Sequence, residues 1–155
     1  MTLVFSAITV GVFAIAGTVM AVRDVQVHLV RNRDIAVGVG LLLVIAVVWS
    51  VQTGQWNHLL FGILGGVSFA VVYVMLALLA RGQLGSGDSW VAAFTGLALG
   101  MLYPPALIVG WATPFALAAL PSVVLWIRKG RGAEIAVIPY LVFSAPISVV
   151  IATLM

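Results

Sequence analysis

The sequence predicts an all-α integral membrane protein, a single bundle of six transmembrane helices, and three observations lead to this prediction. Of the 155 residues, 64% are hydrophobic and 7% are charged, whereas soluble chains average roughly 45–50% apolar and about 25% charged residues. The apolar residues form runs long enough to cross a bilayer. The seven Lys and Arg residues fall in short segments between these runs. No polar block is long enough for a separate soluble domain, so residues 1–155 are expected to form one membrane domain.

The apolar runs give the number of spans. A helix needs about 20 apolar residues to cross the hydrocarbon core, within a range of roughly 17–25. Five runs meet this length and the fourth is short. "YPP" separates the fourth run from the fifth, because proline lacks a helical N–H donor and clashes with the preceding turn. The predicted spans are about residues 3–22, 35–51, 57–80, 89–103, 104–127 and 133–154.

The first two spans open the bundle. No basic segment precedes residues 3–22 and no small-residue cleavage site precedes a mature domain, so this run is interpreted as a retained span rather than a removed signal peptide. Asp34 stands just before residues 35–51. Because aspartate is a good helix-capping residue, Asp34 is predicted mainly to cap this second helix.

The remaining spans carry glycine pairs and prolines. Gly62 and Gly66 in the third span, like Gly96 and Gly100 in the fourth, are four positions apart and let helix backbones approach closely in lipid. Ordinary helix packing is the simplest interpretation of both pairs. Kinks are expected in the fifth and sixth spans at Pro114, Pro121, Pro139 and Pro146.

The charged residues determine the predicted topology. The second loop (52–56) and the fourth ("YPP") carry no charge, so all basic residues fall on one side. The positive-inside rule makes that side cytoplasmic. Both termini are then outside, and the protein belongs in the plasma or inner membrane. Acid–base chemistry is expected at the cytoplasmic side, because all four acidic residues lie there: Asp24, Asp34, Asp88 and Glu134.

The composition also excludes several classes of site. Cysteine is absent, which excludes a disulfide framework, a thiolate zinc site and a cysteine nucleophile. The two histidines lie far apart in the sequence, so no metal site and no cofactor are expected. The net charge of +3 reflects topology rather than nucleic-acid binding. The expected environment is the lipid bilayer.

The short fourth span draws attention to Asp88. The run from Ser89 to Tyr103 makes about 22 Å of helix, less than the hydrocarbon core of about 30 Å. Asp88 would then lie below the membrane surface, in a protein-lined or watered cavity. An ionisable residue at that depth is a functional-site hypothesis. The alternative interpretation is that "GSGD" (85–88) is a turn followed by a helix cap.

Asp24 and Asp88 together suggest one chemistry. Alone, Asp24 is explained more simply by an ion pair with neighbouring Arg23, and Glu134 suits the positive end of the last helix. Two carboxyl groups close together cannot both ionise easily, so one stays protonated while the other is a base. The base activates a water and the acid polarises a peptide carbonyl. This is the chemistry of an aspartic protease.

Two motifs resemble a known family. "GSGD" matches the GxGD signature of intramembrane aspartyl proteases. "DVQVHLVRN" resembles the segment of type IV prepilin and preflagellin peptidases in which an aspartate follows the first span and an asparagine closes the motif. Here these residues are Asp24 and Asn32. The order of the motifs and the six spans resemble the small members of that family, such as those of Tad-type pilus systems.

The resemblance implies a GxGD aspartyl protease-like bundle that cleaves the basic leader from prepilin-like precursors at the cytoplasmic face. Asp24 and Asp88 would be the catalytic pair, and Gly85 and Gly87 would let the substrate approach the backbone near Asp88. Two departures bear on loop geometry and substrate preference. Many members have proline before Asn32 and lysine two positions after the GxGD aspartate, where this sequence has Arg31 and Trp90. The cysteine loop of the longer members is missing, so methylation of the product is not implied.

Two other classes of protein stay open. In a small proton-coupled transporter, Asp24 and Asp88 would belong to a proton relay. The lack of a clear repeat and of a mid-span acidic residue argues against this class. In a catalytically inactive subunit of a pilus or secretion system, the glycine faces would hold the bundle together and the aspartates would be dispensable.

Overall fold

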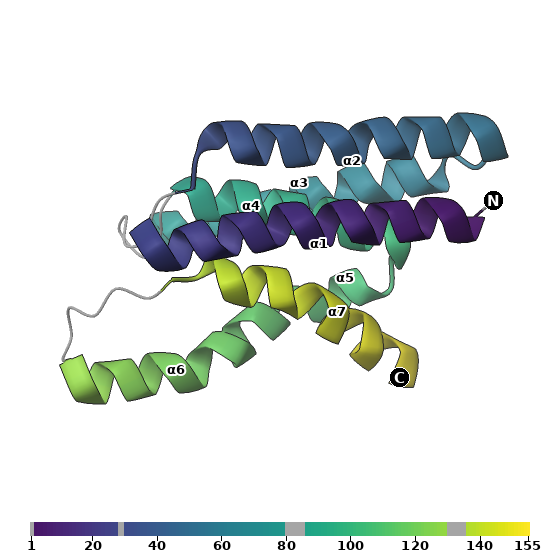
Figure 1. The fold of residues 1–155 in the computed structure, drawn as a ribbon. Helices are drawn as coiled ribbons and strands as arrows, with labels where there is room; N and C mark the ends of the chain where they lie inside the picture. The colour runs from purple at the N-terminus through teal and green to yellow at the C-terminus, as the bar shows by residue number, and fades with distance from the viewer. Residues whose placement is uncertain (1, 28–29, 80–85, 130–135) are drawn as a thin grey trace.

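A computed structural model describes residues 2–27, 30–79, 86–129 and 136–155. Within these ranges the chain is helical and has no strand (Figure 1). The helices of the described ranges are α1 (Thr2–Val27), α2 (Asn32–Thr53), α3 (Asn57–Leu79), α4 (Ser86–Leu102), α5 (Ala106–Gly110), α6 (Thr113–Lys129) and α7 (Ile138–Leu154).

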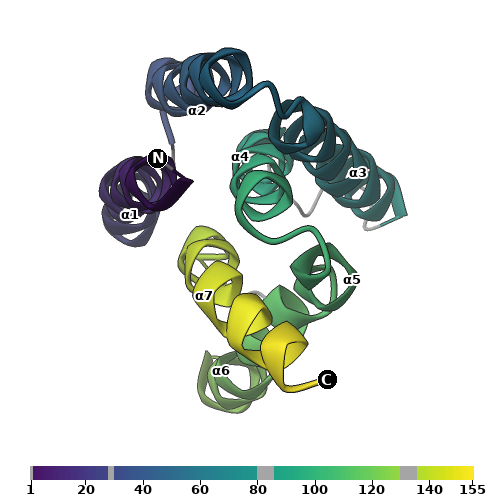
Figure 2. The ribbon, with the colours of Figure 1, turned by 90° about the vertical axis from the view of Figure 1, so that its right-hand side faces the viewer.

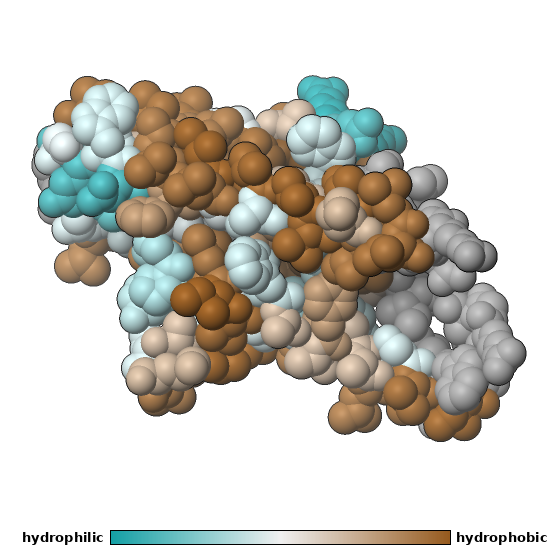
Figure 3. Space-filling view, turned by 180° about the vertical axis from the view of Figure 1, so that it is seen from behind, coloured by the Kyte–Doolittle hydropathy of each residue, from teal (hydrophilic) through white to brown (hydrophobic). Residues whose placement is uncertain are grey.

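The helices have the length and surface of a multi-pass membrane protein. Within the described residues, four apolar stretches are long enough to cross a membrane: α1, α2, α3 and Ala106–Val124, which joins α5 to most of α6. Helix α7 is apolar over 17 residues. Figure 3 shows apolar residues over the middle of one face, with hydrophilic residues gathered toward the two ends. Such a belt is what contact with lipid tails requires.

Helix α4 lies at the centre of the bundle. It contacts α1, α2, α3, α5 and α7, and the end-on view in Figure 2 shows these helices around it. Between Val91 and Met101 every residue except Ala93 is buried. A helix that is apolar on all sides is covered by protein. A short helix is tolerated here because its surroundings are other helices rather than lipid.

The packing role predicted for the glycines is confirmed at the interface of α3 and α4, which is the most extensive contact of the bundle. A Cβ atom added to Gly96 would meet the carbonyl oxygen of Gly65, and one added to Gly100 would meet the carbonyl oxygen of Phe61. A Cβ atom at Gly62 would lie 2.7 Å from Cγ of Met101. The two backbones are therefore in direct contact, which only residues without a side chain allow.

Several predicted boundaries differ from the structure, and three of them matter most for the polar residues at the helix ends. Helix α1 continues to Val27, so Asp24 lies within the helix rather than beyond its end. Helix α4 begins at Ser86, which puts Asp88 in the first turn rather than at the cap. Helix α7 begins only at Ile138, with Pro139 in its first turn, where proline is favoured. Hydropathy marks where a helix leaves lipid, whereas backbone hydrogen bonds decide where it ends.

The predicted fifth span, 104–127, is two helices rather than one. Pro114 has no N–H group to donate to the carbonyl of Gly110, so the helical ladder is interrupted there. The N–H of Ala112 bonds instead to the carbonyl of Val109 at 3.1 Å, a tighter turn. Trp111 and Ala112 therefore form a turn that separates α5 from α6.

The other prolines behave in two ways. The break predicted at "YPP" is confirmed, since α4 ends at Leu102 and α5 begins at Ala106. Pro121 and Pro146 lie inside α6 and α7 without ending them. A proline alone therefore does not decide whether a helix of this bundle continues.

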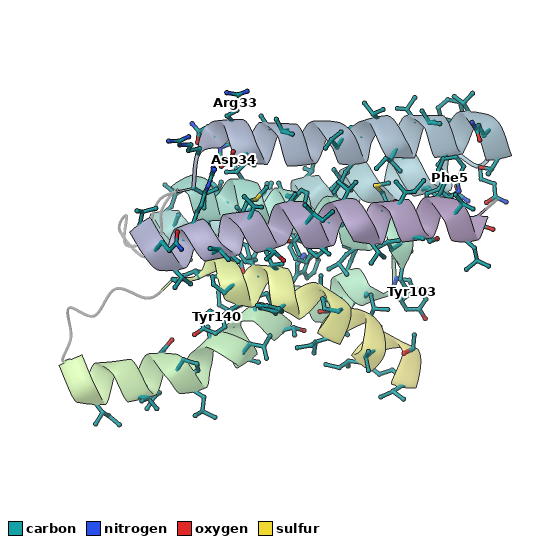
Figure 4. All side chains as sticks on the ribbon, in the orientation of Figure 1. Phe5, Arg33, Asp34, Tyr103 and Tyr140 are labelled. Atoms are coloured by element: carbon teal, nitrogen blue, oxygen red, sulfur yellow. The ribbon has the colours of Figure 1, made fainter. Side chains whose placement is uncertain are left out.

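Charged residues gather at one end of the bundle. Helix α1 ends there, and α2, α4 and α7 begin there, whereas both chain termini lie at the opposite end (Figure 1). Figure 4 labels Arg33 and Asp34 at the charged end, and Phe5 and Tyr103 toward the other. Three of the four acidic residues share this end, as predicted, and Glu134 lies outside the described residues.

Candidate functional site

Asp24 connects the first helix of the bundle to α7. Its side chain is buried, with 7% exposed. Its Oδ2 atom accepts a hydrogen bond of 3.1 Å from the backbone N–H of Ile138, the first residue of α7. The first N–H groups of a helix have no partner within the helix, and they favour a negative charge nearby. Asp24 therefore caps α7 from a neighbouring helix.

Asp34 has a different partner. The sequence suggested Arg23 as the partner of Asp24, but the structure pairs Arg23 of α1 with Asp34 in the first turn of α2. The predicted capping role of Asp34 is wrong, because the cap position is Arg31 and no side chain caps this helix. The ion pair is partly exposed and connects α1 to α2. Asp34 thus contacts α1, whereas Asp24 contacts the start of α7.

Asp88 faces α3. It lies half-buried in the first turn of α4, where the helix dipole favours a negative side chain. The glycine contacts between α3 and α4 align it with Tyr73 of α3. The Tyr73 side chain is buried and stacks on Phe115 of α6, with ring centroids 5.4 Å apart. Asp88 is therefore close to an aromatic hydroxyl that comes from another helix.

The structure brings the two predicted catalytic aspartates to one end of neighbouring helices. Helix α1, which carries Asp24, contacts α4, which carries Asp88, and α7 contacts both. Asp24 lies near the end of its helix and Asp88 near the start of its own, and these two ends lie together (Figure 1). Of the two carboxyl groups, that of Asp88 is the more exposed, because Asp24 is buried.

The motif glycines are only partly described. Gly85 lies outside the described residues. Gly87 directly precedes Asp88 in α4, and a Cβ atom added there would meet no atom of the described residues within 4 Å. Packing therefore does not require glycine at position 87.

Asn32 and Trp90 lie on one groove. Asn32 is exposed at the start of α2, and Trp90 is exposed on α4, two positions after Asp88. They lie at a groove of about 500 Å³ between the two helices. A stripe of apolar and small residues of α2 forms the rest of its lining. The lining residues are Asn32, Ile35, Ala36, Val39, Gly40, Leu43 and Trp90.

The sequence did not single out Tyr73. Gly65 and Tyr73 are eight positions apart on α3, as are Asp88 and Gly96 on α4. This equal spacing points to Tyr73 only once the contact between Gly65 and Gly96 is known. The bond from Ile138 to Asp24 had no local signal, since it joins residues 114 positions apart.

No family model, curated protein or solved structure matches this chain. The residues described above therefore define the site by their geometry alone. They define a helical membrane protein in which two aspartates from adjacent helices lie at the charged end of the bundle.

Proposed function

We propose that this protein is a membrane aspartic endopeptidase that removes the basic leader from prepilin-like precursors. The observation that carries the proposal is the placement of Asp24 and Asp88 at one end of the contacting helices α1 and α4. The proposal includes six transmembrane helices, both termini outside, and the aspartates at the cytoplasmic face of the plasma membrane.

In the proposed reaction the two aspartates share one proton. The ionised carboxylate takes a proton from a water molecule as its oxygen attacks the scissile carbonyl carbon, and the protonated carboxyl gives its proton to the carbonyl oxygen. The tetrahedral intermediate then collapses. The C–N bond breaks, the amine leaves with the proton first taken from water, and the other carboxylate recovers its proton from the diol. No covalent intermediate and no cofactor take part.

Two further features support access of a peptide to the aspartates. No described side chain packs against Gly87, which would let an extended segment approach the backbone next to Asp88. The groove between Asn32 and Trp90 is apolar along α2, as the hydrophobic helix of a prepilin-like precursor requires.

The test is cleavage of a co-expressed precursor in membranes. The precursor has a lysine-rich leader that ends in glycine, then an apolar helix and a soluble reporter. We expect the wild type to shorten it, and Asp24→Asn and Asp88→Asn each to lower the rate by about 10²–10⁴-fold, since each removes an acid–base group. Asp34→Asn is the matched control, because it removes a carboxylate from the same end and is expected to leave cleavage intact. Wild-type cleavage by either catalytic variant would contradict the shared-proton mechanism.

A second candidate function is that of a non-catalytic membrane subunit. The hydrogen bond from Ile138 to Asp24 favours it, because a capping role accounts for Asp24 without any chemistry. This candidate predicts that Asp88→Asn keeps the function of the protein and that Asp24→Asn loses it only by unfolding. Folded but inactive variants at both positions would exclude this candidate.

A further inference from the structure

Helices α3 and α4 run antiparallel in a fixed register. A Cβ atom at Gly100 would meet the carbonyl oxygen of Phe61, and one at Gly96 would meet the carbonyl oxygen of Gly65. The step of four residues from Phe61 to Gly65 along α3 therefore corresponds to a step of four residues backward along α4, from Gly100 to Gly96. Residues four apart lie on the same face of a helix, so the register extends along both helices.

Continuing this register places Tyr73 opposite Asp88. Tyr73 is eight residues after Gly65, and Asp88 is eight residues before Gly96. The electrostatic interaction between Asp88 and the Tyr73 hydroxyl agrees with this placement. The backbone contacts of the glycines thus hold the two side chains on facing positions of the most extensively packed pair of helices.

The Tyr73 hydroxyl is held in place without a partner. The side chain is 1% exposed, and its oxygen has no hydrogen-bond partner among the residues that the structure describes. The ring stacks on Phe115, with planes 19° apart, which fixes its orientation. Buried hydroxyl groups in proteins nearly always find a partner, and one that lacks it calls for an explanation.

We propose that Tyr73 is a positioning residue, whose hydroxyl donates a hydrogen bond to the Asp88 carboxylate when a peptide occupies the site. The inference rests on the proposed function and names a third member of the same site. A neutral phenol is an O–H donor, and hydrogen bonds at catalytic sites are often long in the empty enzyme and shorten with substrate. Donation to the ionised carboxylate orients it and favours the form that acts as base.

The first test compares Tyr73→Phe with Tyr103→Phe, using the leader–reporter precursor defined above as substrate. Both changes remove one hydroxyl and keep the ring, but Tyr103 lies toward the opposite end of the bundle (Figure 4). We expect Tyr73→Phe to lower kcat by at least about tenfold with KM nearly unchanged, and Tyr103→Phe to match the wild type. Equal kcat values for Tyr73→Phe and the wild type would overturn the inference.

A second test does not depend on cleavage. Dicyclohexylcarbodiimide reacts with protonated carboxyl groups in membranes, and mass spectrometry locates the product at Asp88, with Asp88→Asn as the blank. With an uncleavable form of the leader–reporter precursor bound, loss of the donor lets Asp88 hold its proton more often, so we expect several-fold faster labelling in Tyr73→Phe and no change in Tyr103→Phe. Unchanged labelling in Tyr73→Phe would overturn the inference even in an active peptidase. Faster labelling in a protein that cleaves no precursor would support the contact and count against the proposed function.

Discussion

Asp24 is the residue at which a structural and a chemical role meet. Its Oδ2 atom accepts a hydrogen bond from the N–H of Ile138. The proposed reaction also requires the Asp24 carboxyl group to exchange a proton. The proton of a neutral Asp24 therefore belongs on Oδ1, away from the backbone of α7. One carboxyl group can serve both roles, because each uses a different oxygen.

We predict that Asp24→Ala lowers the free energy of unfolding by about 1–2 kcal/mol, because the N–H of Ile138 loses its acceptor. Asp24→Asn is expected to lower it by less, since the amide oxygen still accepts this hydrogen bond. Chemical unfolding in detergent micelles measures both effects. An Asp24→Ala protein as stable as the wild type would show that the contact with α7 contributes nothing to folding.

At the scale of helices, the contact of α3 with α4 organises the site. The glycine contacts set the register of the two helices, and this register puts Tyr73 beside Asp88. A change at the glycines is therefore expected to affect both the stability of the bundle and the geometry of the Asp88 side chain. The stability of the bundle and the position of Asp88 therefore both depend on the contact between α3 and α4.

We predict that Gly96→Ala destabilises the protein by about 1–3 kcal/mol, the usual range for overpacking. The added methyl group would meet the carbonyl oxygen of Gly65, which cannot move without shifting α3. Gly11→Ala is the control, because a Cβ atom there meets nothing within 4 Å. It is expected to be neutral or to stabilise by up to about 1 kcal/mol. Equal unfolding midpoints for the two variants would contradict the close contact.

The sequence predicted the long helices well because lipid requires unbroken runs of apolar side chains, and α1, α2 and α3 provide them. It predicted kinks at both Pro114 and Pro121 but not that the helix would be interrupted only near Pro114. Pro114 and Pro121 look alike in the sequence, yet the helix breaks near the first and continues through the second. A proline leaves the carbonyl group four residues before it without an N–H donor. Whether a neighbouring helix can satisfy that carbonyl depends on the packing of the bundle.

The sequence predicted less of the site than of the fold. Motif spacing singled out Asp24 and Asp88, and the charge pattern predicted that they share one end of the bundle. The partners of the acidic residues were missed, because Arg23 meets Asp34 and Ile138 meets Asp24 only after the helices pack. Contacts of this kind depend on the rotation of each helix, which hydropathy does not report.

At the scale of the whole molecule, all described charged side chains lie at one end and both chain termini at the other (Figures 1 and 4). Applied to this arrangement, the positive-inside rule predicts that the aspartates face the cytoplasm. An orientation experiment therefore tests the topology of the fold and the location of the proposed reaction together.

We predict that single cysteines report this orientation directly, because the chain has none of its own. In intact cells, a membrane-impermeant maleimide is expected to label Gln55→Cys, between α2 and α3, from outside. Asn32→Cys, at the start of α2, is expected to react only after permeabilisation. The reverse labelling pattern would place Asp24 and Asp88 outside and exclude cleavage of a cytoplasmic leader.

The contact between α1 and α7 has a consequence for the order of events during synthesis. Asp24 enters the membrane early, but the N–H group that it caps belongs to a helix translated 114 positions later. Until α7 has left the ribosome, Asp24 lacks this partner and the central helix α4 lacks its contact with α7. The carboxylate end of the bundle is therefore completed only after translation of α7, so the proposed reaction would require the full chain.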